Sequence, residues 1–211
     1  MLLAGGLKRL GGDDARRWVD DVRWRIEKHE TLGSTMDLAA ARAVAGEPAG
    51  LVIWAEQQSA GRGRLGRVWQ ADAGTSLLVT LLLRPTLSVV RDPELSREIA
   101  AAAARAIQRV TGFQPDIKAP NDLMAGGRKL AGILCQTSLR GAEVDYLLVG
   151  IGLNVNLPAA RLPLPTATSL LVETGRPHDR DALLAAILDE VLVMPGLASG
   201  EDEPGSADWA G

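Results

Sequence analysis

The chain has 211 residues, of which 46% are hydrophobic, and this is enough to bury a full core in one domain. Lys and Arg number 23 against 26 Asp and Glu, so the formal net charge of -3 argues against a general attraction for nucleic acid or for anionic membranes. The single cysteine, Cys135, excludes a disulfide framework. No secretory signal pattern opens the chain, so the expected compartment is the cytoplasm.

The first regular elements follow a lead-in over residues 1–21, which has no clear period and is expected to be poorly ordered or weakly helical. Apolar and polar residues alternate over 22–30, as in a half-buried strand, and Ser34 then fits the N-cap of an alanine-rich helix that ends near Gly46. A short strand over 50–56 leads into a loop of glycines and arginines.

The second half of the chain predicts a sheet with helices packed against it. The apolar run 75–84 indicates a strand buried on both faces, too short to cross a bilayer, and 93–112 is the strongest helix. Further strands are expected over 116–120, 128–139 and 144–157, with hairpins around Gly126-Gly127 and Arg140-Gly141, and further helices over 167–175 and 179–194.

These elements predict an α+β fold, a mixed and mainly antiparallel sheet packed against helices. We expect one domain over residues 22–196 and an acidic tail over 197–211 that is disordered.

The glycine and arginine loop has the sequence QQSAGRGRLGRVWQ over residues 57–70. Glycines let a backbone approach an anion, and arginines supply the charge, but the loop fits neither of the common nucleotide-binding glycine patterns. Taken alone, such a loop is more often a solvated turn or an RNA contact.

Two other segments carry polar residues beside glycines. In KAPNDLMAGGRKLAGIL over 118–134, Lys129 stands at the start of a strand beside Gly132 and could point into a pocket, although a lysine there is more often solvated. Asn121-Asp122 alone would be a turn. In GIGLNVN over 150–156, Asn154 and Asn156 are expected to point the same way on a strand, or else to end it.

Together these blocks resemble the biotin protein ligases. ETLGSTMDLA, AEQQSAGRGRLGRVW, PNDL followed by RKLAGIL, and GIGLNVN occur in the order and approximate spacing of that family, and the resemblance covers residues 22 to about 193. It implies a ligase that uses ATP to form biotinyl-5′-AMP and then transfers biotin to a lysine of a biotin carboxyl carrier domain. Mg²⁺ is the implied metal, with no dedicated metal site in the chain. About twenty residues precede the matching region, so the monofunctional type without an N-terminal DNA-binding domain is expected.

The resemblance also implies roles for single residues. For binding, it implies that Ser34 and Thr35 hydrogen-bond the ureido ring, that Gln58 lies at the pocket and that Trp69 is a wall for adenine; the remaining binding positions are Arg62, Gly63, Arg64, Arg67, Lys129, Gly132 and Asn154. For catalysis, it implies Lys129 at the biotin carboxylate and α-phosphate, Asp122 positioning the attacking lysine or Mg²⁺, and Arg64 in the closing loop.

Three departures from the family pattern are visible. Met36 stands where asparagine is common, Ala119 replaces a tryptophan and so should remove an aromatic wall of the site, and Gln136 replaces a glutamate. We expect the small C-terminal domain usual in the family to be missing, because it would not fit in the residues after 196. A paralogue that binds biotin or biotinyl-AMP without efficient transfer is therefore the alternative. RNA binding is disfavoured by the acidic chain and its 3% aromatic content, and a homodimer is compatible with the family.

Overall fold

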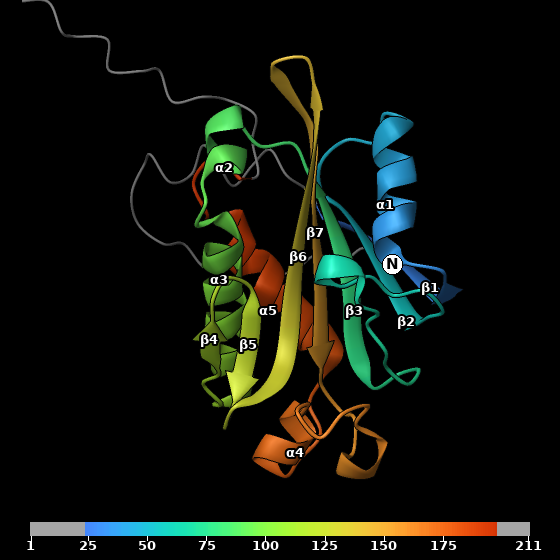
Figure 1. Ribbon diagram of the computed structural model, residues 1–211, viewed down its shortest axis with the longest axis vertical. Coiled ribbons are helices and arrows are strands. Elements are labelled where there is room, and N and C mark those ends of the chain that lie inside the picture. Colours follow the sequence, from blue (N-terminus) through green and yellow to red (C-terminus); the bar gives the residue numbers. More distant parts are fainter. Residues whose placement is uncertain (1–23, 198–211) are drawn as a thin grey trace, which may run out of the picture.

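The computed structural model of the protein describes residues 24–197 (Figure 1). The predicted lead-in and residues 198–211 of the predicted tail lie outside this range. Leu197, which the prediction placed in the tail, is instead buried in the core. The elements are β1 (Arg25–Leu32), α1 (Thr35–Val44), β2 (Leu51–Gln58), η1 (Arg64–Gly66), β3 (Ser76–Leu83), α2 (Leu87–Arg91), α3 (Leu95–Thr111), β4 (Asp116–Lys118), β5 (Asp122–Ala125), β6 (Arg128–Arg140), β7 (Glu143–Asn154), η2 (Ala159–Arg161), α4 (Leu170–Thr174) and α5 (Arg180–Leu192).

The strands form a 7-stranded sheet in the order β1-β2-β3-β7-β6-β5-β4. Only β1 and β2 run parallel, because α1 forms the crossover that connects them, and every other neighbouring pair is antiparallel. The long β6–β7 hairpin lies at the centre and extends past the helices at one end (Figure 1). The predicted α+β class with a mainly antiparallel sheet is confirmed.

Helices cover both faces of the sheet. α3 and α5 pack on one face, where they form the larger core with side chains of β2, β3, β6 and β7. α1 packs on the other face over a smaller cluster that includes Met36, Ile53 and Leu148. Strand β3 is buried at all eight of its positions, which confirms the strand predicted to be covered on both faces. No helix in the described range is long and apolar enough to cross a membrane.

The structure differs from the predicted elements in three places. β5 was not predicted, because four residues beside Asn121 resemble a turn; β5 pairs with both β4 and β6, and Gly126-Gly127 forms the β5–β6 hairpin. Helix α2, five residues long, was also not predicted. β7 ends at Asn154, so of the two alternatives for Asn154 and Asn156 the end of the strand is confirmed and the shared strand face was wrong.

Candidate functional site

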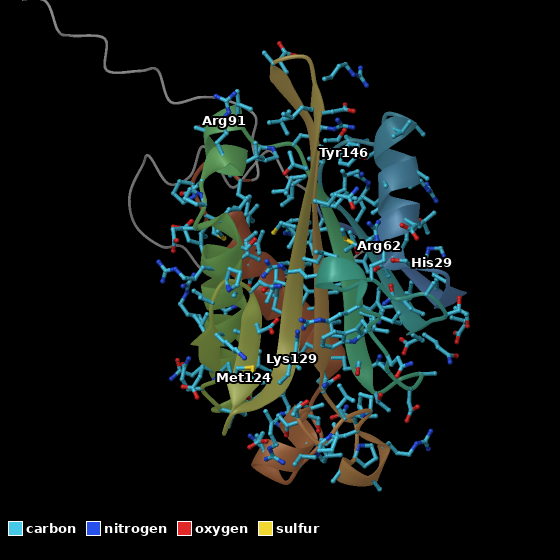
Figure 2. All side chains as sticks on the ribbon, viewed as in Figure 1. His29, Arg62, Arg91, Met124, Lys129 and Tyr146 are labelled. Carbon is cyan, nitrogen blue, oxygen red and sulfur yellow. The ribbon has the colours of Figure 1, made fainter. Side chains whose placement is uncertain are left out.

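A cavity of about 440 Å³ opens on the α1 side of the sheet. Its walls come from the start of α1, the loop after β2, strands β6 and β7, and residues 163–167. Figure 2 shows Arg62 on the side of α1 and Lys129 on β6. All of the predicted site residues except Ser34 line this cavity: Thr35, Gln58, Arg62, Gly63, Arg64, Arg67, Trp69, Asp122, Lys129, Gly132 and Asn154.

Glycines form the floor of the cavity on β6 and β7. Gly132 and Gly152 are register partners on the two strands, and Gly150 lies two residues before Gly152 on the same face. A Cβ on Gly152 would lie 2.6 Å from Cε2 of Trp69, and a Cβ on Gly150 would lie 2.7 Å from Sδ of Met36. The absence of side chains at these positions therefore lets Trp69 and Met36 lie directly on the sheet.

The α1 end of the cavity carries neutral polar groups. The Thr35 backbone N–H donates to Gln58 Oε1 at 2.7 Å, and the Thr35 hydroxyl donates to the same oxygen at 3.1 Å. Thr80 from β3 in turn donates to Thr35 Oγ1 at 2.8 Å. Ser34 is the N-cap of α1, as predicted, with its Oγ accepting from the Met36 N–H. The structure therefore places Ser34 at the helix start and not in the cavity wall.

The other end of the cavity carries an ion pair. The Lys129 ammonium lies 2.7 Å from Asp122 Oδ1 and 5.7 Å from the centroid of the Trp69 ring. The backbone of Lys129, at the start of β6, is hydrogen-bonded to the chain that follows η2. The Lys129 N–H donates to the Thr166 carbonyl, and the Thr168 N–H donates to the Lys129 carbonyl. Lys129 is thus a cavity residue, and the alternative of a solvated strand-edge lysine does not hold.

The arginine loop lies across the cavity and is anchored at several points. Arg62 pairs with Asp37 of α1 at 3.0 Å, and Arg64 donates to Asn121 Oδ1 at 2.9 Å. A short antiparallel bridge joins Arg62 to Val68 and closes the loop on itself. These contacts tie the loop to both sides of the cavity, so the alternative of an unattached solvated turn does not describe it.

Two asparagines have fixed positions at the cavity. Asn121 donates from Nδ2 to the Ile133 carbonyl at 2.6 Å, which leaves its Oδ1 for Arg64. Asn154 donates to the Thr168 carbonyl at 2.9 Å, so part of its amide is used to hold the chain after β7. Asn156 is not part of the cavity lining, and its side chain is hydrogen-bonded to the backbone N–H and carbonyl of His178.

The cavity is positively charged although the chain as a whole is not. Among the lining residues, the cations are Arg62, Arg64, Arg67 and Lys129, and the one carboxylate is Asp122. Such a cavity favours an anion, and guanidinium groups suit the bidentate recognition of carboxylate and phosphate. The cavity can therefore attract an anion although the net charge of the whole chain is negative.

The departures from the family pattern have different places in the structure. Met36 lines the cavity and is 3% exposed. Ala119 is exposed in the turn between β4 and β5, and neither it nor Gln136 belongs to the described cavity lining. Ala119 therefore does not border the cavity in this structure, so the prediction of a lost aromatic wall finds no support in the cavity lining.

Part of the cavity wall was not predicted from the sequence. Asn121 was considered only as a turn, and the wall formed by Pro163, Leu164, Thr166 and Ala167 was not singled out. That wall belongs to a proline-rich segment with no strand or helix periodicity. The glycine spacing in GIG over 150–152, two residues apart on one strand, was the available signal for the floor.

The comparisons with known proteins point to one group. Residues 30–154 match the family model described as the biotin/lipoate A/B protein ligase family. The chain is 36% identical over 163 residues to the bifunctional ligase/repressor BirA of Bacillus subtilis, a match that covers 76% of this chain and 50% of that protein. It is 33% identical over 174 residues to the biotin--[acetyl-CoA-carboxylase] ligase of Mycobacterium tuberculosis, covering 80% of this chain and 63% of that protein.

A solved structure of a biotin protein ligase has a similar fold. The biotin protein ligase of Aquifex aeolicus in complex with biotin and ATP superposes with a TM-score of 0.66 and 28% identity, covering 78% of this chain and 67% of that one. The chain spans about half the length of the first curated relatives it matches. These comparisons support the family and the fold of this chain.

Proposed function

Because the chain belongs to the biotin/lipoate A/B protein ligase family, we propose that it is a biotin protein ligase that joins biotin to a carrier protein with ATP. The observation that carries the proposal is that one cavity has neutral hydrogen-bonding groups at one end and Lys129 at the other. Biotin has the same polarity, a neutral ureido ring at one end and a carboxylate at the other.

The proposed first step is the activation of the biotin carboxylate. One carboxylate oxygen attacks the α-phosphorus of ATP, a new P–O bond forms, the bond to the bridging oxygen breaks, and pyrophosphate leaves. Negative charge builds on the phosphoryl oxygens in the transition state, and the Lys129 ammonium, held by Asp122, would stabilise it there. Arg64 and Arg67 would contact the phosphates from the loop.

The proposed second step transfers the biotinyl group to the acceptor. The amine of a carrier lysine attacks the acyl carbon of biotinyl-5′-AMP, AMP leaves, and the amine loses a proton as the amide forms. Asp122 is the carboxylate of the cavity lining and is therefore the candidate to orient that amine. The proposed acceptor is the biotin carboxyl carrier domain of acetyl-CoA carboxylase or a related carboxylase, in the cytoplasm.

The donor set is compatible with Mg²⁺ that arrives with the nucleotide. Within residues 24–197 no group of three or more His, Cys, Asp or Glu side chains is placed to hold a metal. Mg²⁺ is commonly bound through one or two carboxylates together with substrate phosphates, and Asp122 could be the one protein carboxylate. When bound, the ion would neutralise phosphate charge.

Transfer of biotin is the experiment that tests the proposal. The purified protein is incubated with biotin, ATP and Mg²⁺, and pyrophosphate release, biotinyl-AMP and labelling of a carrier domain are followed separately, with an ATP-free control. We expect all three products in the complete mixture only. If neither pyrophosphate release nor biotinyl-AMP is detected, the proposal is wrong. Biotinyl-AMP that forms and stays bound to the protein without labelling of the carrier would instead identify the non-transferring paralogue.

A further inference from the structure

Thr80 is a fully buried polar residue in the middle of the apolar strand β3. It does not line the cavity, but its hydroxyl lies 2.8 Å from Oγ1 of Thr35, which does. A hydroxyl buried in an apolar strand costs free energy unless it is hydrogen-bonded, and Thr35 provides the partner. Thr80 is therefore connected to the cavity wall through one side chain.

The direction of this hydrogen-bond chain follows from its first member. The backbone N–H of Thr35 can only donate, so the atom of the Gln58 amide that faces it at 2.7 Å is the oxygen. The Thr35 hydroxyl, 3.1 Å from that oxygen, donates its one hydrogen to it. Thr80 must then be the donor to Thr35. The chain thus runs from Thr80 through Thr35 to Gln58 Oε1.

The other end of the Gln58 amide is the nitrogen. With the oxygen held by Thr35, Nε2 and its two N–H donors remain, and within the described residues no acceptor contacts Nε2. Nε2 lies 3.1 Å from the position that a Cβ on Gly61 would take, so the glycine leaves room beside it. Gln58 thereby offers donors to a ligand in the cavity and cannot offer its oxygen.

We propose that Thr80 is a positioning residue that, through Thr35, holds the Gln58 amide with its N–H donors toward the ligand. The site then selects a ligand whose ring carries a hydrogen-bond acceptor at this end, such as the carbonyl of a cyclic urea. The inference rests on the proposed function in taking biotin as that ligand. In a purely structural role, Thr80 would satisfy its own hydroxyl and have no effect on Gln58.

The test compares two substitutions at Thr80 with one control. Thr80→Val keeps the shape and removes the donor, Thr80→Ser keeps the donor, and Leu82→Val trims an apolar side chain two residues along the strand on the same face. Titration calorimetry gives the Kd values for biotin and for ATP. In the ligand-free protein, NMR follows the Gln58 side-chain NH₂ signals, which are identified by their loss in Gln58→Leu.

We expect Thr80→Val to raise the Kd for biotin about five- to tenfold, the factor of one lost hydrogen bond, and to leave the Kd for ATP unchanged. It should also shift the Gln58 NH₂ signals, while Thr80→Ser and Leu82→Val keep the wild-type values. Unchanged Gln58 signals in Thr80→Val, an equal effect in Leu82→Val, or a parallel loss of ATP affinity would overturn the role of Thr80. Shifted signals in a protein whose wild type does not bind biotin would overturn the proposed function and leave the role of Thr80 standing.

Discussion

The indole ring of Trp69 lies on the backbone of Gly152, so closely that a Cβ there would be 2.6 Å from Cε2. Gly152→Ala must therefore displace the ring, and overpacking of this kind typically costs about 1–3 kcal/mol. We expect the affinity for ATP to fall about tenfold, measured by calorimetry. Gly33→Ala is the control, because a Cβ at Gly33 meets nothing within 4 Å. Equal ATP affinity in the two variants would contradict the placement of Trp69 at the nucleotide.

The second prediction concerns Lys129 and its neighbour on the strand. Lys129 points into the cavity and pairs with Asp122, whereas Arg128 pairs with Glu173 and is not part of the cavity lining. Lys129→Ala should slow pyrophosphate release about 100-fold or more, as expected when a charge that stabilises the transition state is removed. Arg128→Ala should keep more than half of the wild-type rate. If both variants are equally slow, the ammonium of Lys129 has no special part in the first step.

The third prediction concerns the arginine loop. Arg64 joins the loop to the β4–β5 turn through Asn121. Removing a charged hydrogen bond costs about 1.5–3 kcal/mol, so Arg64→Ala should release biotinyl-AMP about tenfold faster or more. The measurement is the off-rate of labelled adenylate after a chase with unlabelled biotin and ATP. Arg97→Ala removes an exposed arginine of α3 that pairs with Glu94 and should leave the off-rate unchanged. An unaltered off-rate in Arg64→Ala would count against a closing loop.

The fourth prediction is a pH dependence of stability. Burial, and then the charge of Arg176, lower the pKa of His178, whose Nε2 lies 2.7 Å from Thr174 Oγ1. The folded state favours the neutral form of His178. Near the ordinary histidine pKa of about 6.5, the unfolded chain therefore binds a proton at His178 more readily than the folded chain does. The free energy of unfolding contributed by His178 should be complete above about pH 7.5 and should decline as the pH falls through 6.5.

The check is urea unfolding of wild type and His178→Gln at about pH 7.5 and 5.5. Between about pH 7.5 and 5.5, the free energy of unfolding of the wild type should fall by more than that of His178→Gln. A difference between the two proteins that stays constant, or that favours the wild type at low pH, would refute the prediction.

The helices and strands that the sequence predicted are those with a clear period or a clear end. The alanine-rich helix after Ser34 and the helix that ends at Gly112 were found because their caps are local in sequence. Strand β5 was not found, since four residues carry too little pattern and its pairing with β4 and β6 depends on segments on either side. Boundaries such as the end of β7 at Asn154 depend on what covers the strand.

In the site, too, the features that lie within one sequence segment could be predicted, and those that depend on contacts between distant segments could not. All of the site residues that the resemblance singled out, except Ser34, line the cavity, because motifs such as GRGRLGR and RKLAGIL lie within continuous segments. It could not place Ala119 relative to the cavity, since that depends on how β4 and β5 turn. Nor could it find Thr80, whose importance comes from a hydrogen bond between β3 and α1, 45 positions apart in the chain.

The crowding of Arg62, Arg64, Arg67 and Lys129 around one cavity has a consequence for the direction of the reaction. Arg62 pairs with Asp37 and Lys129 with Asp122, so it is Arg64 and Arg67 that give the cavity its excess of positive charge, which a multivalent anion would neutralise. Pyrophosphate is such an anion, and in the proposed reaction it is also the first product. We therefore expect product inhibition and a readily reversible first half-reaction, in which net adenylate formation depends on the removal of pyrophosphate by hydrolysis.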